Sequence, residues 1–348
     1  MCGIDMNTQP TEKLTIDQVA EYCGVSKTTI SRFLNGKYGN MSADTRERIA
    51  NGIHDLNYRP NRTAQRLKAS RTMLIGCVIA DISSPFSAIL LKGITRVCEE
   101  NGYQVLFADS RENAARERRA IEGFLENRVD GLIVNTCGDN DEYLLGLIGR
   151  GVPTVLADRE LMTDGMMDTV TSPNRRTSAD CTDFLFDRGY ENVAFFSETI
   201  GSISPRLHRR SGYLDAVNAR GCTEAEVYEF TTDSHEECAA AVKTFVDSHR
   251  GERSAILCSN GKCAQHVLMA INALGLVPGA ELGLCTFDDW DWLHIARPGI
   301  TAVSLCSAEI GAKSAELLIK RLSGELPADD SPVWFTVPAQ LIVRDSTP

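Results

Sequence analysis

The chain has 348 residues, of which 43% are hydrophobic and 24% are charged, a composition that is ordinary for a globular protein. No apolar run approaches the roughly 18 residues that a membrane span needs, and the first 14 residues contain no apolar core of a secretion signal. We therefore expect a cytoplasmic protein without membrane contact, in which most of the 12 cysteines are small buried side chains rather than disulfides.

The net charge of −11 is distributed unevenly along the chain. Residues 13–72 contain 11 Lys and Arg against 5 Asp and Glu, a net +6, and residues 1–12 carry −2, so the remaining residues carry −15. A basic segment can bind the polyanion DNA, whereas an acidic body is repelled by it. The charge pattern therefore favours a DNA-binding head on an acidic body.

The N-terminal part has the pattern of three short helices. Thr15 followed by Gln18 has the spacing of a capping box, and Gly24 ends the first helix. A second helix is expected from residue 26 to about 34, and a third from residue 42 to about 56. The apolar residues that would form their shared core are Ile16, Val19, Ala20, Cys23, Ile30, Phe33, Leu34, Ile49, Ile53 and Leu56. Helix, tight glycine turn and helix predict a helix-turn-helix head.

The second helix would present polar and basic side chains to DNA. Lys27 and Thr28 lie near its beginning, where such a helix reads base edges in the major groove. Ser31 and Arg32 are placed to reach bases or phosphates, and Asn35 lies in a loop expected to contact the DNA backbone. Thr29 is exposed on the same helix.

A basic segment follows the three helices. Pro60 or Asn61 can open a short helix that carries Arg62 and places Ala64 and Leu67 on one face. Such a helix is too short to be stable alone, but pairing with a symmetry mate on DNA would stabilise it. Its leucine suits insertion between base steps in the minor groove. The alternative is a basic linker without a structure of its own.

From residue 73 the chain alternates short apolar runs with amphipathic stretches. The expected strands are residues 73–79, 104–108, 131–135, 154–156, 193–197, 255–258 and 282–286. The expected helices include residues 89–101, 112–127, 177–188, 210–220 and 264–274. This alternation predicts an α/β body with parallel sheets, whose ligand sites lie at the carboxyl ends of the strands.

Motifs of enzymes and cofactor sites are missing from the sequence. There is no Gly-x-Gly-x-x-Gly or P-loop, no Gly-x-Ser-x-Gly, and no metal-type spacing among the six histidines. We therefore expect no enzyme activity, no cofactor and no metal. A sugar-converting enzyme fused to a DNA-binding head, or a sugar-binding protein without a regulatory role, are the remaining alternatives.

The N-terminal residues resemble the DNA-binding head of the LacI/GalR family of bacterial transcription regulators. The resemblance is carried by residues 19–26, 29–32, 35–36, 45–46 and 56–61. It implies that Lys27, Thr28 and Arg32 contact operator bases. It further implies that Thr15, Asn35 and Tyr58 contact phosphate or support the head, and that Leu67, next to Ala64, opens the centre of the operator.

The same resemblance implies the domain organisation. Residues 13–59 would be the helix-turn-helix head, 60–72 a hinge helix and linker, and 73–348 an effector-binding and dimerisation domain. That domain would have the two-lobed, type I periplasmic-binding-protein-like fold. Lobe one is expected at about 73–173 and 304–334, and lobe two at about 174–303 and 335–348. A homodimer would then bind a pseudo-palindromic operator in double-stranded DNA.

The effector is expected in the cleft between the lobes. By the resemblance, the residues that contact it are Asp81, Ser83, Phe86, Ser87, Asp158, Asn174, Arg206, Arg209, Asn260 and Asp288, and Lys262, which departs from the family pattern, is expected beside them. The aromatic ring of Phe86 could stack on a sugar face. Two acids common in the family are absent here, and Lys262 is added near Arg206 and Arg209. Since guanidinium groups bind carboxylate or phosphate with two hydrogen bonds, we favour a sugar acid or sugar phosphate. A neutral sugar or a nucleobase is the alternative, and the direction of the response stays open.

Overall fold

The computed structural model describes residues 14–34, 36–39, 41–58, 71–163, 166–221, 224–231, 234–327 and 331–348. The chain divides into two units, Met1–Thr72, which we call the head, and Met73–Pro348, which we call the body. Among the predicted DNA-binding residues, Asn35, Asn61, Arg62, Ala64 and Leu67 lie outside the described residues, so the predicted hinge helix does as well.

The head contains the three predicted helices, α1 (Ile16–Tyr22), α2 (Lys27–Leu34) and α3 (Ala43–Asp55). Thr15 and Gln18 form the complete capping box at the start of α1, each side chain accepting a hydrogen bond from the other residue's backbone N–H. Gly24 has a φ of +62°, which lets the chain turn directly into α2. The helix-turn-helix prediction is confirmed.

The three head helices share one small apolar core. Its buried members are Val19, Ala20, Cys23, Ile30, Ile49 and Tyr58, and the other predicted core residues pack around them. Ser42 caps α3 by accepting a hydrogen bond from the Thr45 N–H at 3.2 Å. The core is closed by residues from all three helices, so it fixes how α2 is presented to solvent.

The body is built on two sheets of six strands each. In spatial order the first sheet contains β11 (Trp334–Thr336), β5 (Asp168–Thr171), β4 (Thr154–Ala157), β3 (Gly131–Val134), β1 (Leu74–Ile79) and β2 (Gln104–Asp109). The second contains β12 (Gln340–Ile342), β10 (Thr301–Ser304), β9 (Leu282–Phe287), β8 (Ser254–Cys258), β6 (Asn192–Glu198) and β7 (Glu226–Phe230). All pairs are parallel except β10 with β12. We call the two sheets with their helices lobe one and lobe two.

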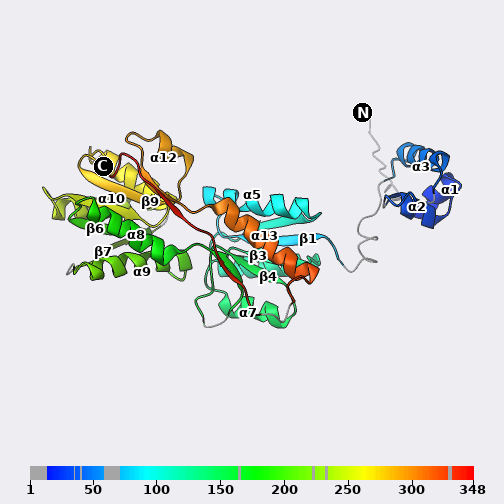
Figure 1. The fold of residues 1–348 in the computed structure, drawn as a ribbon, viewed down its shortest axis with the longest axis horizontal. Helices are drawn as coiled ribbons and strands as arrows, with labels where there is room; N and C mark the ends of the chain where they lie inside the picture. Colours follow the sequence, from blue (N-terminus) through cyan, green and yellow to red (C-terminus); the bar gives the residue numbers. More distant parts are fainter. Residues whose placement is uncertain are drawn as a thin grey trace, which may run out of the picture. The chain divides into compact units, whose positions relative to one another are not determined.

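Helices cover both faces of each sheet (Figure 1). In lobe one, α5 (Pro85–Glu100) and α13 (Ser307–Ser323) pack on one face, and α6 (Ala114–Glu126) and α7 (Asp141–Gly149) on the other. In lobe two, α8 (Asn174–Asp187) and α9 (Ser204–Ala219) oppose α10 (His235–Ser248) and α11 (Gly261–Ala273), with α12 (Asp291–Ile295) beside the latter pair. Along β1, alternate residues face opposite layers: Ile75 and Cys77 point to α5 and α13, and Val78 to α6.

The chain passes between the lobes three times, after β5, after β10 and after β11. Strand β11 pairs with β5 in the first sheet up to Thr336, so lobe one extends two residues beyond the expected boundary at 334. This crossing pattern places the carboxyl ends of the parallel strands of both sheets beside the crossing segments. Residues from many distant parts of the sequence therefore meet there.

The described cysteines are free, and all of them except Cys306 are buried, as expected. No helix among the described residues combines the length and the apolar character needed to cross a membrane. The same residues contain no group of three or more His, Cys, Asp and Glu side chains arranged to hold a metal ion.

Candidate functional site

Helix α2 presents the predicted DNA-reading side chains on the head. Lys27, Thr28 and Arg32 are exposed, while Thr29 and Ser31 are half-buried. The Thr29 hydroxyl lies 2.8 Å from the Ser26 hydroxyl at the start of the helix, so it also serves the helix cap. The exposed side chains therefore lie on the solvent side of α2, with Lys27 and Thr28 at its N-terminus, as a groove-reading helix requires, and Arg32 in its last turn.

Two other predicted DNA-binding residues, Thr15 and Tyr58, stabilise the fold of the head itself. The Thr15 hydroxyl caps α1, and the Tyr58 side chain is buried in the core of the head.

Lys27 forms an ion pair with Asp17 at 2.7 Å, and this pair is largely exposed. Because exposed ion pairs are weak, Lys27 can exchange Asp17 for a phosphate or a base at little cost.

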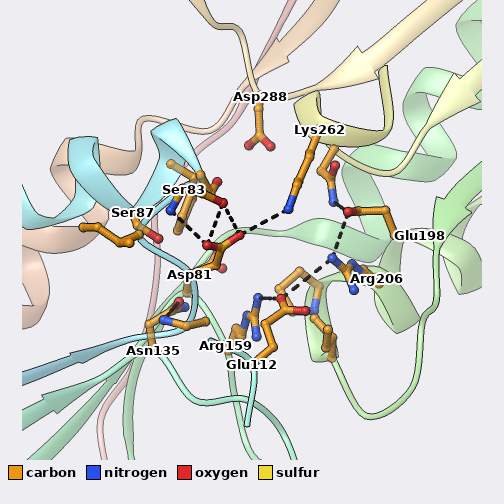
Figure 2. Close-up of a pocket in the computed structure, with 18 of the residues that line it drawn as sticks. Asp81, Ser83, Ser87, Glu112, Asn135, Arg159, Glu198, Arg206, Lys262 and Asp288 are labelled. Atoms are coloured by element: carbon orange, nitrogen blue, oxygen red, sulfur yellow. Dashed lines mark hydrogen bonds and ion pairs between the residues drawn. The ribbon is translucent and has the colours of Figure 1, made fainter. Parts of the chain in front are cut away.

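A cavity of about 520 Å³ lies where the strands of the two lobes end (Figure 2). Ten of the eleven predicted effector residues line it: Asp81, Ser83, Phe86, Ser87, Asp158, Arg206, Arg209, Asn260, Lys262 and Asp288. The fold therefore brings together residues that are up to 207 positions apart, from Asp81 to Asp288, and the resemblance had identified them. The remaining predicted residue is Asn174.

Asn174 is buried at the start of α8 and does not line the cavity. Its side-chain oxygen accepts a hydrogen bond from Arg209 Nε at 2.9 Å. Another nitrogen of Arg209 donates to the Ser259 carbonyl oxygen at 2.6 Å, and the guanidinium lies 4.3 Å from the centre of the Phe287 ring. These contacts fix the orientation of the Arg209 side chain. Asn174 therefore positions the arginine without lining the cavity itself.

Two buried carboxyls of the cavity, Asp158 and Asp288, interact electrostatically with Arg209. Burial raises the pKa of Asp158 to about 6, although Arg209 and Arg159 oppose the shift. Burial also raises the pKa of Asp288, against the opposing charge of Arg209 and a backbone hydrogen bond from Gly261. Burial lowers the pKa of Arg209, and the two acids counteract this shift. The cavity thus contains a buried cation together with two buried acids that ionise reluctantly.

The structure adds charged and polar residues that the sequence analysis missed. They are Asp109, Arg111, Glu112, Asn135, Arg159 and Glu198. Each is the last residue of a strand or follows within a few residues of its end, so the rule that ligand sites lie at the carboxyl ends of parallel strands was the signal that could have found them. Arg111 and Glu112 also have φ values of +51° and +50°, a conformation that costs non-glycine residues energy and that nothing in the sequence indicated.

The missed residues change the charge balance of the cavity. The acids Asp81, Asp109, Glu112, Asp158, Glu198 and Asp288 line it together with the cations Arg111, Arg159, Arg206, Arg209 and Lys262. The sequence analysis had included only three of these six acids, Asp81, Asp158 and Asp288. The site is therefore a polar network of both signs rather than a positively charged pocket.

Ion pairs organise this network, and the following three are drawn in Figure 2. Arg206 bonds Glu198 at 2.8 Å, Arg159 bonds Glu112 at 2.8 Å, and Lys262 lies 3.3 Å from Asp81. Burial alone would raise the pKa of Glu112, but Arg159 and Arg206 outweigh it and lower the pKa below its ordinary value. The pKa of Asp81 is lowered in the same way, mainly by hydrogen bonds from Ser83 and by Lys262 against the effect of burial. Both carboxyls are therefore ionised at neutral pH.

Comparison with known families identifies both units of the chain. Residues 15–61 match the family model of bacterial regulatory proteins of the lacI family, and residues 72–333 match periplasmic binding proteins and the sugar binding domain of the LacI family. The chain belongs to the LacI family of bacterial regulatory proteins. It is a DNA-binding transcriptional regulator, as the sequence predicted.

Relatives within the LacI family align along nearly the whole chain. The HTH-type transcriptional regulator KdgR of Bacillus subtilis is 33% identical over 98% of this chain and 100% of its own length. The HTH-type transcriptional regulator PtxS of Pseudomonas plecoglossicida is 34% identical over 98% of each chain. The structure of the lac repressor dimer bound to operator and the anti-inducer ONPF superposes with a TM-score of 0.84 at 23% identity, covering 97% of this chain and 99% of that one. The predicted LacI-type fold is thereby confirmed.

Proposed function

We propose that this LacI-family regulator represses carbohydrate catabolism genes and that a sugar acid or sugar phosphate in the cavity between the lobes controls it. The observation that carries the proposal is a pair of unsatisfied acceptors. Asp158 and Glu198 line the cavity, and Oδ1 of Asp158 and Oε1 of Glu198 are buried atoms without a hydrogen-bond partner within the described part of the chain. Buried acceptors without partners are costly, and hydroxyl groups of a ligand would satisfy them.

The cations of the cavity would bind the negatively charged group of such a ligand. A sugar acid or sugar phosphate has hydroxyl groups for the acids and one anionic end for guanidinium or ammonium groups. Arg206 and Arg209 are almost fully buried, where a charged hydrogen bond is stronger than at the surface. A neutral sugar would use the acids alone, and the six lining carboxyls keep it as the second candidate.

On the DNA side, we propose that Lys27, Thr28 and Arg32 of α2 read bases and that the segment 60–72 acts as the hinge, with Leu67 at the operator centre. The regulator would act as a homodimer on a pseudo-palindromic operator in the cytoplasm. Two features support a dimer: Phe107 is exposed on the edge strand β2, and Ile89 on α5. The lac repressor of the structural comparison is itself a dimer on its operator.

A thermal-shift comparison of matched compounds tests the effector class. D-Gluconate, D-glucose 6-phosphate, D-glucose and adenine are each added to the purified full chain. A ligand that binds only the folded state raises the melting temperature, so we expect the two anions to raise it more than D-glucose or adenine. A rise with D-glucose alone would establish the neutral-sugar alternative, and no rise with either anion would contradict the proposed effector class.

A further inference from the structure

Two ion pairs cross the cavity from lobe one to lobe two. Asp81 follows β1 in lobe one and lies 3.3 Å from the Nζ of Lys262, in the first turn of α11. Glu112 follows β2 and lies 3.8 Å from Arg206, in the first turn of α9. Both pairs line the cavity, and Figure 2 shows the carboxylates and their cations facing each other across it.

Each carboxylate is held more closely within its own lobe than across the cavity. Asp81 accepts hydrogen bonds from the Ser83 hydroxyl at 2.7 and 2.8 Å and from its N–H at 2.9 Å. Glu112 accepts one from Arg159 at 2.8 Å. The contacts across the cavity are the longer ones, so they can break while each carboxylate keeps its partners in lobe one.

The cation Arg206 is likewise anchored in its own lobe. It donates to Glu198 at 2.8 Å and to the Thr199 carbonyl oxygen at 2.8 Å. A ligand anion that reaches Arg206 therefore finds it already oriented and needs to displace only Glu112. Lys262 has a side chain that is 28% exposed, so it is accessible from the cavity in the same way.

The backbone at Glu112, which pairs with Arg206 across the cavity, has a strained conformation. Arg111 and Glu112 are consecutive non-glycine residues with φ near +50°. The loop is tied to the end of β1, because the Glu112 N–H donates to the Ala80 carbonyl oxygen at 2.7 Å. Left-handed non-glycine residues persist only where the surrounding structure holds them, often at ligand sites. Here the strained loop fixes a carboxylate at the rim of lobe one.

We propose that Asp81 and Glu112 are internal counter-ions, which pair with Lys262 and Arg206 across the cavity until an anionic effector displaces them. Binding then exchanges an ion pair between the lobes for one between effector and lobe two. In the free protein both cations are paired, Lys262 with Asp81 and Arg206 with Glu112 as well as Glu198. A neutral sugar has no charge to replace Asp81 or Glu112, so it cannot drive the exchange. This inference rests on the proposed function and adds the groups that select for a negative charge.

Isothermal titration of the full chain with D-gluconate, D-glucose 6-phosphate and D-glucose tests the proposal. Asp81→Asn and Glu112→Gln each remove one competing charge and keep the side-chain shape. Each variant should bind an anionic compound roughly 1.5- to fivefold more tightly, the range expected for one partly exposed ion pair. Glu122→Gln is the matched control, because Glu122 belongs to lobe one but pairs with Arg150 on the surface, outside the cavity. It should leave all affinities unchanged.

A double variant separates competition from a structural effect. In a Lys262→Met background, Asp81→Asn should no longer tighten binding of the anions, since the cation that it frees is gone. D-Glucose should not bind more tightly to any of the variants. Each of the two carboxylates is tested independently, so one variant that fails to fold leaves the other to decide.

The outcomes distinguish this inference from the proposed function. If the wild-type chain binds an anionic compound and neither substitution tightens the binding, the counter-ion proposal is overturned while the effector class stands. If the wild-type chain and all variants bind D-glucose only, the effector class and the counter-ion role are both wrong.

Discussion

Asp158 and Asp288 occupy matching positions in the two lobes. Each follows the strand that is third in the spatial order of its sheet, β4 or β9. Each is buried with a φ near +68°, and each interacts electrostatically with Arg209. The sequence resemblance predicted both as effector contacts, but it gave no sign that they form a symmetric pair. Their raised pKa values follow from burial in a folded cavity, which no local sequence pattern reveals.

Asp158→Asn should stabilise the protein at neutral pH. The folded-state pKa of about 6 lies above the ordinary 3.8, so the contribution of Asp158 to stability is full below pH 3.8 and is lost as the pH rises through 6. The amide removes this loss, and asparagine tolerates the left-handed backbone of this position. At pH 7.5 the variant should gain at most about 3 kcal/mol in free energy of unfolding.

Urea unfolding of both proteins at pH 5 and pH 7.5 measures this effect. The difference between variant and wild type should be larger at pH 7.5. An equal difference at both pH values would mean that Asp158 does not titrate with a raised pKa.

Among the elements, the central strands and their helices were predictable because their sequences carry the signal themselves. Strand β1 is apolar along its length, and α5 has an apolar stripe at helical period. The sequence analysis did not predict β5, β7, β10, β11, β12, α7, α10, α12 and α13. Strands β11 and β12 are three residues each, and β11 is wholly exposed, so only pairing with distant strands makes them strands.

Close helix packing in both lobes depends on glycine. A Cβ on Gly93 of α5 would lie 1.9 Å from the Ala308 carbonyl oxygen in α13, and one on Gly212 of α9 would lie 1.9 Å from the Arg175 carbonyl oxygen in α8. Such backbone contacts cannot yield by rotating a side chain. The helices of each pair would have to move apart.

Gly93→Ala should therefore lower the free energy of unfolding by about 1–3 kcal/mol or more, as overpacking does. Gly123→Ala in α6 is the control, because a Cβ there meets nothing within 4 Å. It should stabilise the helix by roughly 0.5–1 kcal/mol. Denaturant unfolding of the two variants compares them directly, and equal stability would show that α5 and α13 are not packed as described.

For the whole molecule, the charge pattern and the motifs of the head were enough to predict a DNA-binding regulator. The three head helices form from local caps, stripes and one glycine turn, so their prediction needed no distant contact. The cavity was harder to predict, because its residues come from strand ends in both lobes and its acids balance its cations only in the fold. That balance led us to propose competition between effector and protein carboxylates.

The central claim, sequence-specific binding to DNA, is tested most directly by selecting genomic fragments with the purified full chain and sequencing those retained. The selection is run without additions and with D-gluconate or D-glucose 6-phosphate. We predict that a small set of fragments is enriched over input, that they share a pseudo-palindromic site, and that the enrichment changes when an effector is added. Retention of all fragments in proportion to input under every condition would contradict the account.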